Sequence, residues 1–431
     1  MTTIIYWFRN DLRLADNPAL IQACHSAKQL IPVYCHDSIQ DILQPWGFKR
    51  VGVHRQHWLR ANLADLADQL KQHGSALIEL SGNPPEMLAT LARQVGASSI
   101  VCEEIAAPEE QAQVAALRGN GITVNTKWQS TMLHPDDLPF QARDLPDVFS
   151  AFRNRIEQDL VRPALPLAAP RIFPPLPEEL EDAYSSPHTM VTATAEPDAR
   201  SSFPYHLPAF AGGETAARRH LDRYLSRKLA HSYKATRNGL TGTDYSSKCS
   251  PWLATGAISA RTIDAEIKQF ESEDGANEGT YWLWFELLWR DYFRLLHLKY
   301  GRRLYLAGGL TLQPDPSHDK AAFVQWCRGE TGQPLVDAGM RELAATGYLS
   351  NRLRQIVASY LIYDLACDWR AGAAWFESQL IDYDVYSNQG NWLYIAGRGT
   401  DPRGGRRFNP EKQAHDYDPA GDYQALWRQP M

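Results

Sequence analysis

The sequence predicts an α/β domain with a five-stranded, parallel, Rossmann-like sheet, followed by an all-α domain. Three observations predict this order. Short apolar runs alternate with helical patterns over residues 1–130, a proline-rich stretch falls within residues 131–213, and helical patterns fill residues 214–431. A chain of 431 residues is long enough for two such domains.

The first domain is predicted from five apolar runs, each of a length that suits one buried strand. Helical patterns such as His57–His73 and Pro85–Val95 lie between them, and such alternation indicates βαβ units with a parallel sheet. Asn17 followed by Pro18 marks a helix start, because asparagine caps free N–H groups and proline has none to leave unpaired. The runs are Thr3–Phe8, Leu30–Tyr34, Ala76–Leu80, Ser99–Cys102 and Ile122–Lys127.

The segment 131–213 is predicted to be a linker. Ten of the 27 prolines of the chain fall within residues 160–208. Proline removes a backbone donor and fixes φ, so little regular structure is expected there. We expect this segment to lie over the surface of the protein.

The second domain is predicted to be all-α, because its apolar residues recur at helical spacing and no series of strands interrupts them. It also contains nine of the 13 tryptophans. Tryptophan fills cores, stacks on flat ligands and carries electrons. The clearest helical patterns are Glu214–Ala230, Ser259–Glu273, Tyr281–Tyr300, Lys320–Arg328, Val336–Thr346, Arg352–Ala366 and Gly372–Gln379.

The composition excludes several classes of protein. The net charge of -6 argues against a generally cationic nucleic-acid coat, although arginines on one face still suffice to bind phosphates. The six cysteines are scattered without a CxxC pair, which indicates free thiols and predicts no metal site. The chain shows no signal peptide and no apolar run of membrane-spanning length, so we expect a cytoplasmic protein without a membrane anchor.

The stretch 351–392 contains an unusual number of polar groups within an apolar helical pattern. Buried charges are costly unless they are partnered, and such a cluster commonly surrounds a polar ligand. The alternative is a core ion-pair network, which has the same appearance in a sequence. The polar residues are Asn351, Arg352, Arg354, Asp382, Asp384 and Asn388.

Two further segments have the chemistry of a binding site. Hydroxyls and a lysine precede a helix at Tyr245–Lys248, which suits a phosphate or diphosphate, although a plain capped helix would look alike. In the helix Tyr281–Tyr300, Glu286, Trp289 and Arg290 lie close together at helical spacing. A glutamate beside an aromatic ring suits a nucleobase, whereas the alternative is an amphipathic helix with an internal ion pair.

In their order and spacing these segments resemble the photolyase/cryptochrome family along nearly the whole chain. The opening WFRNDLRLADNPAL resembles that family's first strand and helix. The motifs TRNGLTGTDYSSKCSPWLATG, ELLWRDYFR and NQGNWLYIAGRGTDPRGGRRFNP follow in the family's order. The resemblance implies an FAD-binding second domain and repair of cyclobutane pyrimidine dimers in DNA by an electron from excited, reduced flavin.

The resemblance assigns two groups of residues to FAD. One group would hold the diphosphate, and the other would surround the flavin ring and ribityl chain, with Asn388 facing the ring nitrogen that takes up a proton. The diphosphate residues are Tyr233, Ser246, Ser247, Lys248 and Ser250. The flavin residues are Asn351, Arg354, Asp382, Asp384 and Asn388.

The resemblance also assigns a pocket for a flipped pyrimidine dimer. Gln355 and Tyr394 stand where ordinary dimer photolyases have methionine and tryptophan. At both positions the chain resembles the cryptochrome DASH branch. That branch repairs mainly single-stranded DNA, and a more polar pocket wall with less stacking fits this preference. The pocket residues are Glu286, Trp289, Gln355 and Tyr394, with Arg237, Arg290 and Arg352 near the rim.

Electron transfer and light harvesting are implied in part. Trp392 and Trp369 match the first two tryptophans of the family's electron chain, whereas Pro316 stands near the expected place of the third. Glu109 is the best match to the acid that contacts an antenna, commonly 5,10-methenyltetrahydrofolate in DASH proteins. The alternatives are a solvated acidic helix start and an empty antenna site.

Two other functions are weighed against dimer repair. A blue-light photoreceptor would use the same flavin for signalling, but this chain retains Glu286, Trp289 and Asn388. Repair of the (6-4) photoproduct usually needs paired histidines near the flavin, and no histidine lies between His318 and His415. The resemblance also predicts a monomer whose partner is dimer-containing DNA.

Overall fold

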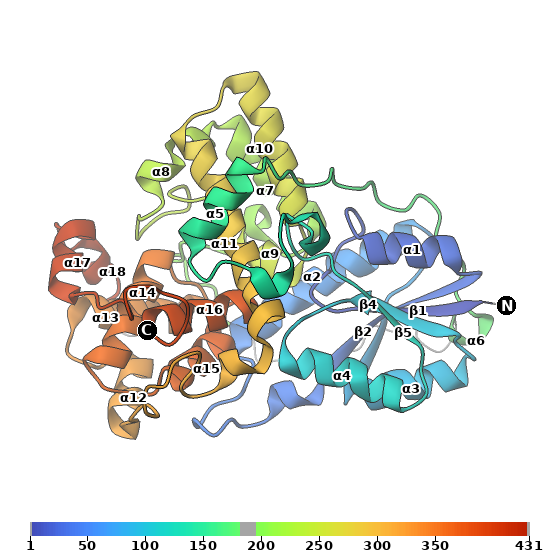
Figure 1. Ribbon diagram of the computed structural model, residues 1–431, viewed down its shortest axis with the longest axis horizontal. Coiled ribbons are helices and arrows are strands. Elements are labelled where there is room, and N and C mark those ends of the chain that lie inside the picture. Colours follow the sequence, from blue (N-terminus) through green and yellow to red (C-terminus); the bar gives the residue numbers. More distant parts are fainter. Residues whose placement is uncertain (1, 182–194, 429–431) are drawn as a thin grey trace.

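The computed structural model describes residues 2–181 and 195–428, and it has two parts that pack side by side (Figure 1). The N-terminal part is a sheet with helices on both faces. The C-terminal part is built of helices, as the sequence predicts.

The sheet has five parallel strands in the order β3-β2-β1-β4-β5. Its central strand is buried along its whole length, which explains why it reads as a continuous apolar run. Ile5 of this strand lies between Ile31 and Ile100 of its two neighbours. The strands are β1 (Thr3–Phe8), β2 (Gln29–Asp37), β3 (Ile78–Gly82), β4 (Ser99–Glu103) and β5 (Val124–Lys127).

The helices of the N-terminal part connect these strands. The predicted cap is confirmed, because the Asn17 side chain accepts a hydrogen bond from the backbone N–H of Leu20 and Pro18 begins the helix. These helices are α1 (Pro18–Ser26), α2 (Val53–Gln72), α3 (Pro84–Gln94) and α4 (Pro108–Gly119).

The described residues of the segment between the two parts run mainly without regular structure. It contains α5 (Phe149–Gln158) and the single turn α6 (Glu178–Glu181). Residues 182–194 of the predicted proline-rich linker lie outside the described residues. Short 3-10 helices occur at Ser38–Asp41, Pro135–Asp137, Ala142–Asp144, Pro208–Phe210, Leu229–Ser232 and Gly301–Tyr305.

Twelve helices follow in the C-terminal part, counted up to residue 428. The pattern Glu214–Ala230 predicts one helix, but α7 ends at Ser226 because Lys228 adopts a left-handed conformation with a φ of 57°. The helices are α7 (Glu214–Ser226), α8 (Tyr233–Thr236), α9 (Ser250–Thr255), α10 (Ala260–Asp274), α11 (Glu278–Tyr300), α12 (Lys320–Arg328), α13 (Pro334–Thr346), α14 (Asn351–Tyr363), α15 (Trp369–Gln379), α16 (Val385–Ile395), α17 (Pro410–Tyr417) and α18 (Asp422–Leu426). Within the described ranges, no helix is both long and apolar enough to span a bilayer.

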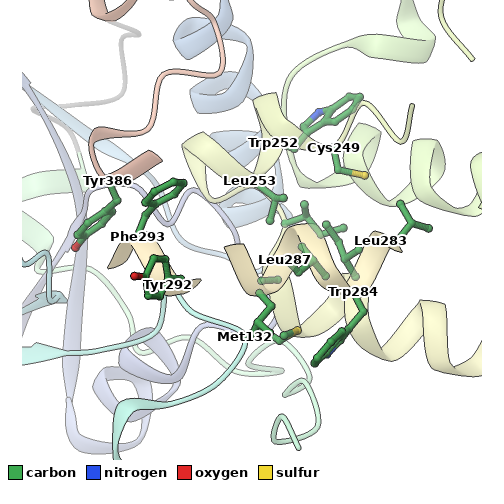
Figure 2. Packing of buried hydrophobic residues seen from close by; sticks show 14 of the residues in the cluster. Met132, Cys249, Trp252, Leu253, Leu283, Trp284, Leu287, Tyr292, Phe293 and Tyr386 are labelled. Carbon is green, nitrogen blue, oxygen red and sulfur yellow. The ribbon is translucent and has the colours of Figure 1, made fainter. Parts of the chain in front are cut away.

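Helix α11 is the central element of the C-terminal part. An Asn277–Thr280 capping box starts it, and its buried face includes Leu283, Trp284 and Leu287. Figure 2 shows these side chains packed between Met132, from the connecting segment, and residues around α9. Since α11 is fixed on both sides, it provides a rigid base for the polar side chains that it also carries.

Candidate functional site

A cavity of about 820 Å³ opens between α8, α11, α14 and α16. This volume lies within the range of about 300–1,000 Å³ that ligand sites usually have. Sixteen of the predicted site residues line it, although they are widely separated in the sequence. They are Tyr233, Arg237, Ser246, Ser247, Lys248, Ser250, Glu286, Trp289, Arg290, Asn351, Arg352, Arg354, Gln355, Asp382, Asp384 and Tyr394.

Arg354 and Asp382 form an ion pair in the cavity wall. Nη2 of Arg354 lies 2.8 Å from Oδ2 of Asp382, and Nε donates to the Leu349 carbonyl. Ser250 donates to the same carboxylate oxygen at 2.7 Å. The other oxygen, Oδ1, is buried and has no hydrogen-bond partner in the described part of the chain. Such a group needs a donor, so a ligand with an N–H or O–H suits this position.

Lys248 is a second buried group that lacks a partner. Its backbone φ is 55°, and its Nζ lies 3.4 Å from the centre of the Tyr245 ring and 4.9 Å from that of Tyr348. Among the residues that the structure describes, neither Nζ nor the Tyr245 hydroxyl has a hydrogen-bond partner. Burial lowers the pKa of Lys248 well below its usual value. An anion in the cavity would satisfy both donors and raise that pKa.

Asp384 caps helix α16 and pairs with Arg294. Its side chain accepts from the N–H of Ser387, and its two oxygens lie 2.9 and 3.0 Å from the terminal nitrogens of Arg294. Burial alone would raise the pKa of Asp384, but Arg294 and Arg290 hold it below its usual value. This carboxylate is therefore a fixed negative charge in the cavity wall.

An aromatic stack lies beside these charges. The Trp289 ring is parallel to that of Phe149, with 3.7 Å between centroids, and the edge of Tyr394 approaches it at 5.7 Å. Phe149 comes from α5, in the segment predicted to be a linker. One face of Trp289 is thus covered, which leaves the ring positioned for a flat ligand in the cavity.

Glu286 lies one helical turn before Trp289 and forms an ion pair with Arg237. The Arg237 guanidinium also lies over the Trp282 ring, 4.2 Å from its centre. Burial raises the pKa of Glu286, while Arg237 opposes that rise. The carboxyl group is held in the cavity, where it can accept a hydrogen bond from a base edge.

Arginines surround the aromatic pocket. Arg406 pairs with Asp401 at 2.7 Å and donates to the Tyr394 hydroxyl, also at 2.7 Å. Arg352 donates to Gln355 at 3.1 Å. Arg403 lines the cavity in the same loop as Arg406 and is exposed. We call Arg237, Arg352, Arg403 and Arg406 the arginine rim; it provides cations for phosphate groups.

Comparison with known proteins identifies the family. Residues 4–171 match the family model described as DNA photolyase, and residues 282–429 match the FAD binding domain of DNA photolyase. The chain is 46% identical to cryptochrome DASH of Xenopus laevis over 436 residues, which cover 98% of this chain and 82% of that protein. The chain belongs to the cryptochrome DASH branch of the photolyase/cryptochrome family.

Solved structures agree with the family's fold. The Synechocystis cryptochrome superposes on this DASH member with a TM-score of 0.93 at 43% identity, covering 99% of this chain and 88% of that one. A bacterial class III photolyase from Agrobacterium tumefaciens superposes with a TM-score of 0.76 at 28% identity, covering 99% and 86%. The predicted architecture and family are confirmed.

Four predicted residues of this DASH member lie outside the lining of the large cavity, and three of them are in the helical part. The Asn388 side-chain amide donates to the Ala373 carbonyl at 3.0 Å. Trp392 is buried in the core, where its ring meets that of Trp326 edge to face at 6.4 Å. Trp369 is buried in the same core and donates from Nε1 to the Ala307 carbonyl. Arg290 does line the cavity, but its guanidinium is engaged by the Ser130 and Leu253 carbonyls.

Glu109 lines a separate cavity of about 150 Å³ near the carboxyl ends of β1 and β2. Its carboxylate pairs with Arg50 at 2.6 Å, and Arg50 also pairs with Glu377 at 2.6 Å. This space is smaller than the roughly 300 Å³ at which ligand pockets begin. A full antenna molecule would have to project from it or displace the Arg50 side chain.

Among the residues that the structure describes, no group of three or more His, Cys, Asp or Glu side chains could hold a metal ion. The six cysteines are free. Cys249 lines the large cavity, and burial raises its pKa to about 12, so its thiol stays protonated at neutral pH.

A buried glutamate behind the cavity makes stability depend on pH. Glu342 accepts hydrogen bonds from Tyr423 at 2.5 Å and Ser202 at 3.0 Å, but burial raises its pKa to about 7. Because the folded-state pKa lies above the unfolded value, its stabilising contribution is complete below about pH 4 and is lost as the pH rises through about 7.

We therefore expect Glu342→Gln to be more stable than the parent protein above pH 7, by up to about 3 kcal/mol, and to show a flatter dependence on pH. Denaturant unfolding between pH 5 and 9 measures the difference. The control is Glu330→Gln, at an exposed glutamate just before the same helix. A parallel pH dependence in Glu342→Gln and the parent would contradict this role.

Proposed function

We propose that this chain is an FAD-dependent photolyase that uses blue light to split cyclobutane pyrimidine dimers, with a preference for single-stranded DNA. One observation carries the proposal. A single cavity combines unpartnered buried polar atoms, a tryptophan with one covered face and a rim of arginines. The unpartnered polar atoms would hold the cofactor, the tryptophan would stack on a flipped base, and the arginines would bind a DNA backbone.

The residues at one part of the cavity fit the diphosphate of FAD. Tyr233, Ser246, Ser247 and Ser250 line it beside Lys248, whose Nζ has no acceptor within the described residues. An anionic diphosphate would supply that acceptor. The unpartnered ammonium group of Lys248 thus supports a diphosphate here independently of the family resemblance.

The charged wall fits the flavin and its ribityl chain. Asn351, Arg354, Asp382 and Asp384 line this part of the cavity, and Oδ1 of Asp382 has no donor. Asn388 would face the ring after its amide leaves the Ala373 carbonyl. Bound reduced FAD would supply one electron to the dimer on illumination, and the electron would return once the ring has split.

The substrate would occupy the aromatic side of the cavity. Trp289 would stack on the flipped dimer, and Glu286 would accept a hydrogen bond from a base N–H. Gln355 and Tyr394 complete the wall, with Arg237 and Arg352 at the rim. A wall with glutamine and tyrosine offers less stacking than methionine and tryptophan. Single strands, which need no unpairing, would therefore be preferred.

An antenna would bind in the smaller cavity near Glu109. This antenna would be 5,10-methenyltetrahydrofolate, whose amino groups suit a carboxylate acceptor. The archaeal photolyase from Sulfolobus tokodaii, with a TM-score of 0.74 at 26% identity, holds two FAD molecules. Flavin is therefore the other chromophore to test for in the purified protein.

Trp369 is proposed to pass electrons inward to Trp392. We expect Trp369→Phe to slow the loss of oxidised-flavin absorbance under blue light by at least about tenfold, because phenylalanine is much harder to oxidise than tryptophan. Illumination with a thiol reductant measures this rate. The control Trp427→Phe changes a buried tryptophan that packs under Arg200 instead. An unchanged rate in Trp369→Phe would show that electrons enter by another route.

The test of function is light-dependent reversal of a thymine dimer by pre-reduced protein, on matched single-stranded and duplex oligonucleotides. Repair of the single strand alone supports the proposal. Equal repair of both strands would contradict the strand preference but not the repair. Failure on both, with FAD bound, would favour a blue-light photoreceptor. The monomeric state and cytoplasmic location stay predictions.

A further inference from the structure

A small chamber lies between the α/β and helical parts, next to the large cavity. It has a volume of about 10 Å³, which is the space of about one water molecule. Arg290 and Asp384 line both the chamber and the large cavity. The chamber therefore adjoins the proposed cofactor site through charged side chains.

Glu103 faces this chamber from the carboxyl end of β4. It is 2% exposed, and its Oε2 is buried without a hydrogen-bond partner among the described residues. The nearby arginines are engaged elsewhere. Arg9 donates to Gln113 and to the backbone carbonyls of Glu103 and Glu110, and Arg13 donates to the backbone carbonyls of Asp16 and Gly256.

Two more unpartnered groups line the same chamber. Nε of Arg294 and Oγ of Ser130 are buried and have no hydrogen-bond partner in the described part of the chain. The two terminal nitrogens of Arg294 bind Asp384. Buried polar groups are normally hydrogen-bonded. Three unpartnered groups around a space of this size therefore indicate that one water molecule can bridge them.

The surroundings favour a neutral Glu103. Burial raises its pKa to about 8, Asp11 adds to the rise, and the three arginines Arg13, Arg294 and Arg9 oppose it. Asp11 itself is well paired, with Tyr6 and Gln129 both donating to it. The charged and titratable groups around Glu103 are Arg9, Asp11, Arg13, Arg290, Arg294, Asp384 and Tyr386.

We propose that Glu103 is a positioning residue whose proton controls the Arg294–Asp384 pair and, through that pair, the affinity of the large cavity for FAD. The inference rests on the proposed function, because it assumes that FAD occupies the cavity. Asp384 connects the two sites, because it lies in the cavity wall and binds Arg294.

The step is a simple proton loss. The O–H bond of the Glu103 carboxyl group breaks, and the proton passes to water in the chamber and then to solvent. The carboxylate that remains is a second anion beside Arg294, whose Nε is unpartnered. It competes with Asp384 for this guanidinium, so Asp384 loses part of the bidentate bond that holds it in position.

The sign of the pH effect follows from this competition. FAD binds best when Glu103 carries its proton, so affinity is highest at neutral pH and falls as the pH rises through about 8. If the pKa of Glu103 is one unit higher with FAD bound than without it, the affinity for FAD falls about tenfold between low and high pH.

The experiment measures the Kd of FAD by flavin fluorescence quenching, over about one and a half pH units on either side of 8. The variant is Glu103→Gln, which keeps the size of the side chain and cannot lose the proton. The matched control is Glu104→Gln, because Glu104 is the next residue and does not line the chamber. The infrared C=O band of a protonated carboxyl group, compared between parent and variant, reports the Glu103 proton directly.

We expect the Kd of the parent and of Glu104→Gln to rise about tenfold over this range, while that of Glu103→Gln stays constant. An equal rise in all three proteins would overturn the inference, and so would a constant Kd in the parent. If no FAD binds at any pH, the proposed function fails and the inference fails with it. Normal FAD binding without a pH effect would overturn the inference alone.

Discussion

Asp382→Asn should leave the protein largely without FAD after purification. In the parent, the Asp382 carboxylate binds Arg354 at 2.8 Å and Ser250 at 2.7 Å, and its second oxygen has no partner. The asparagine keeps the shape but removes the charge, so the partly buried guanidinium of Arg354 loses its counter-ion. Removing one partner of a buried pair costs about 3–5 kcal/mol.

Part of this cost should appear as lost stability and part as lost affinity. Flavin absorbance at equal protein concentration measures occupancy, and titration with FAD measures affinity. Since FAD binding itself stabilises the folded state, unfolding should be compared after FAD has been removed from both proteins. We expect the free energy of unfolding to fall by about 3 kcal/mol.

A second aspartate–arginine pair provides the control. Asp364 binds Arg407 at 3.0 Å, and the Arg407 side chain is 67% exposed. Asp364→Asn should cost less than about 1 kcal/mol, because solvent screens an exposed pair, and should retain FAD. If Asp382→Asn kept FAD with the parent's affinity, the Arg354–Asp382 pair would not be part of the cofactor site.

The sequence predicts the order of the fold well, because strand and helix periodicity are local properties. All five predicted apolar runs overlap an observed strand. The ends are less well predicted, since they depend on contacts that a run of letters does not show. Strand β2 extends to Asp37, because Asp37 pairs in register with Gly82 of β3. Helix α7 ends early because Lys228 becomes left-handed.

In the site, too, local features were predicted and long-range contacts were missed. The predicted residues that line the large cavity belong to motifs, whose members lie close together in the sequence and can be recognised there. Arg294 was missed, although it follows Arg290 by one helical turn on α11 and binds Asp384. That helical spacing was a usable signal. Phe149 was also missed, because no pattern in the connecting segment shows that its ring meets Trp289.

The arginine rim was only partly predicted. Arg403 and Arg406 lie in a glycine-rich loop, where Gly404 and Gly405 both have positive φ. The sequence shows the arginines but not the direction in which the loop turns. Glu103 was missed for another reason, since a glutamate at the end of a strand is usually exposed, whereas this one is buried and faces a chamber lined by residues of both parts.

Trp289→Ala should weaken binding of dimer-containing single strands without loss of FAD. The ring is held parallel to Phe149 at 3.7 Å and close to Tyr394, so it is already oriented before a base arrives. Stacking of one base on such a ring contributes about 1–3 kcal/mol, which corresponds to a loss of about five- to 150-fold in affinity. Fluorescence anisotropy with labelled oligonucleotides measures it.

The control is Tyr281→Ala on the same helix, because Tyr281 is exposed and bonds Glu157 instead of lining the cavity. Its affinity should match the parent's. Trp289 would contact the dimer only after it has left the strand, so the fold-loss should be equal on single-stranded and duplex DNA. A loss confined to duplex DNA would mean that Trp289 assists flipping instead, and equal binding by variant and parent would remove it from the lesion pocket.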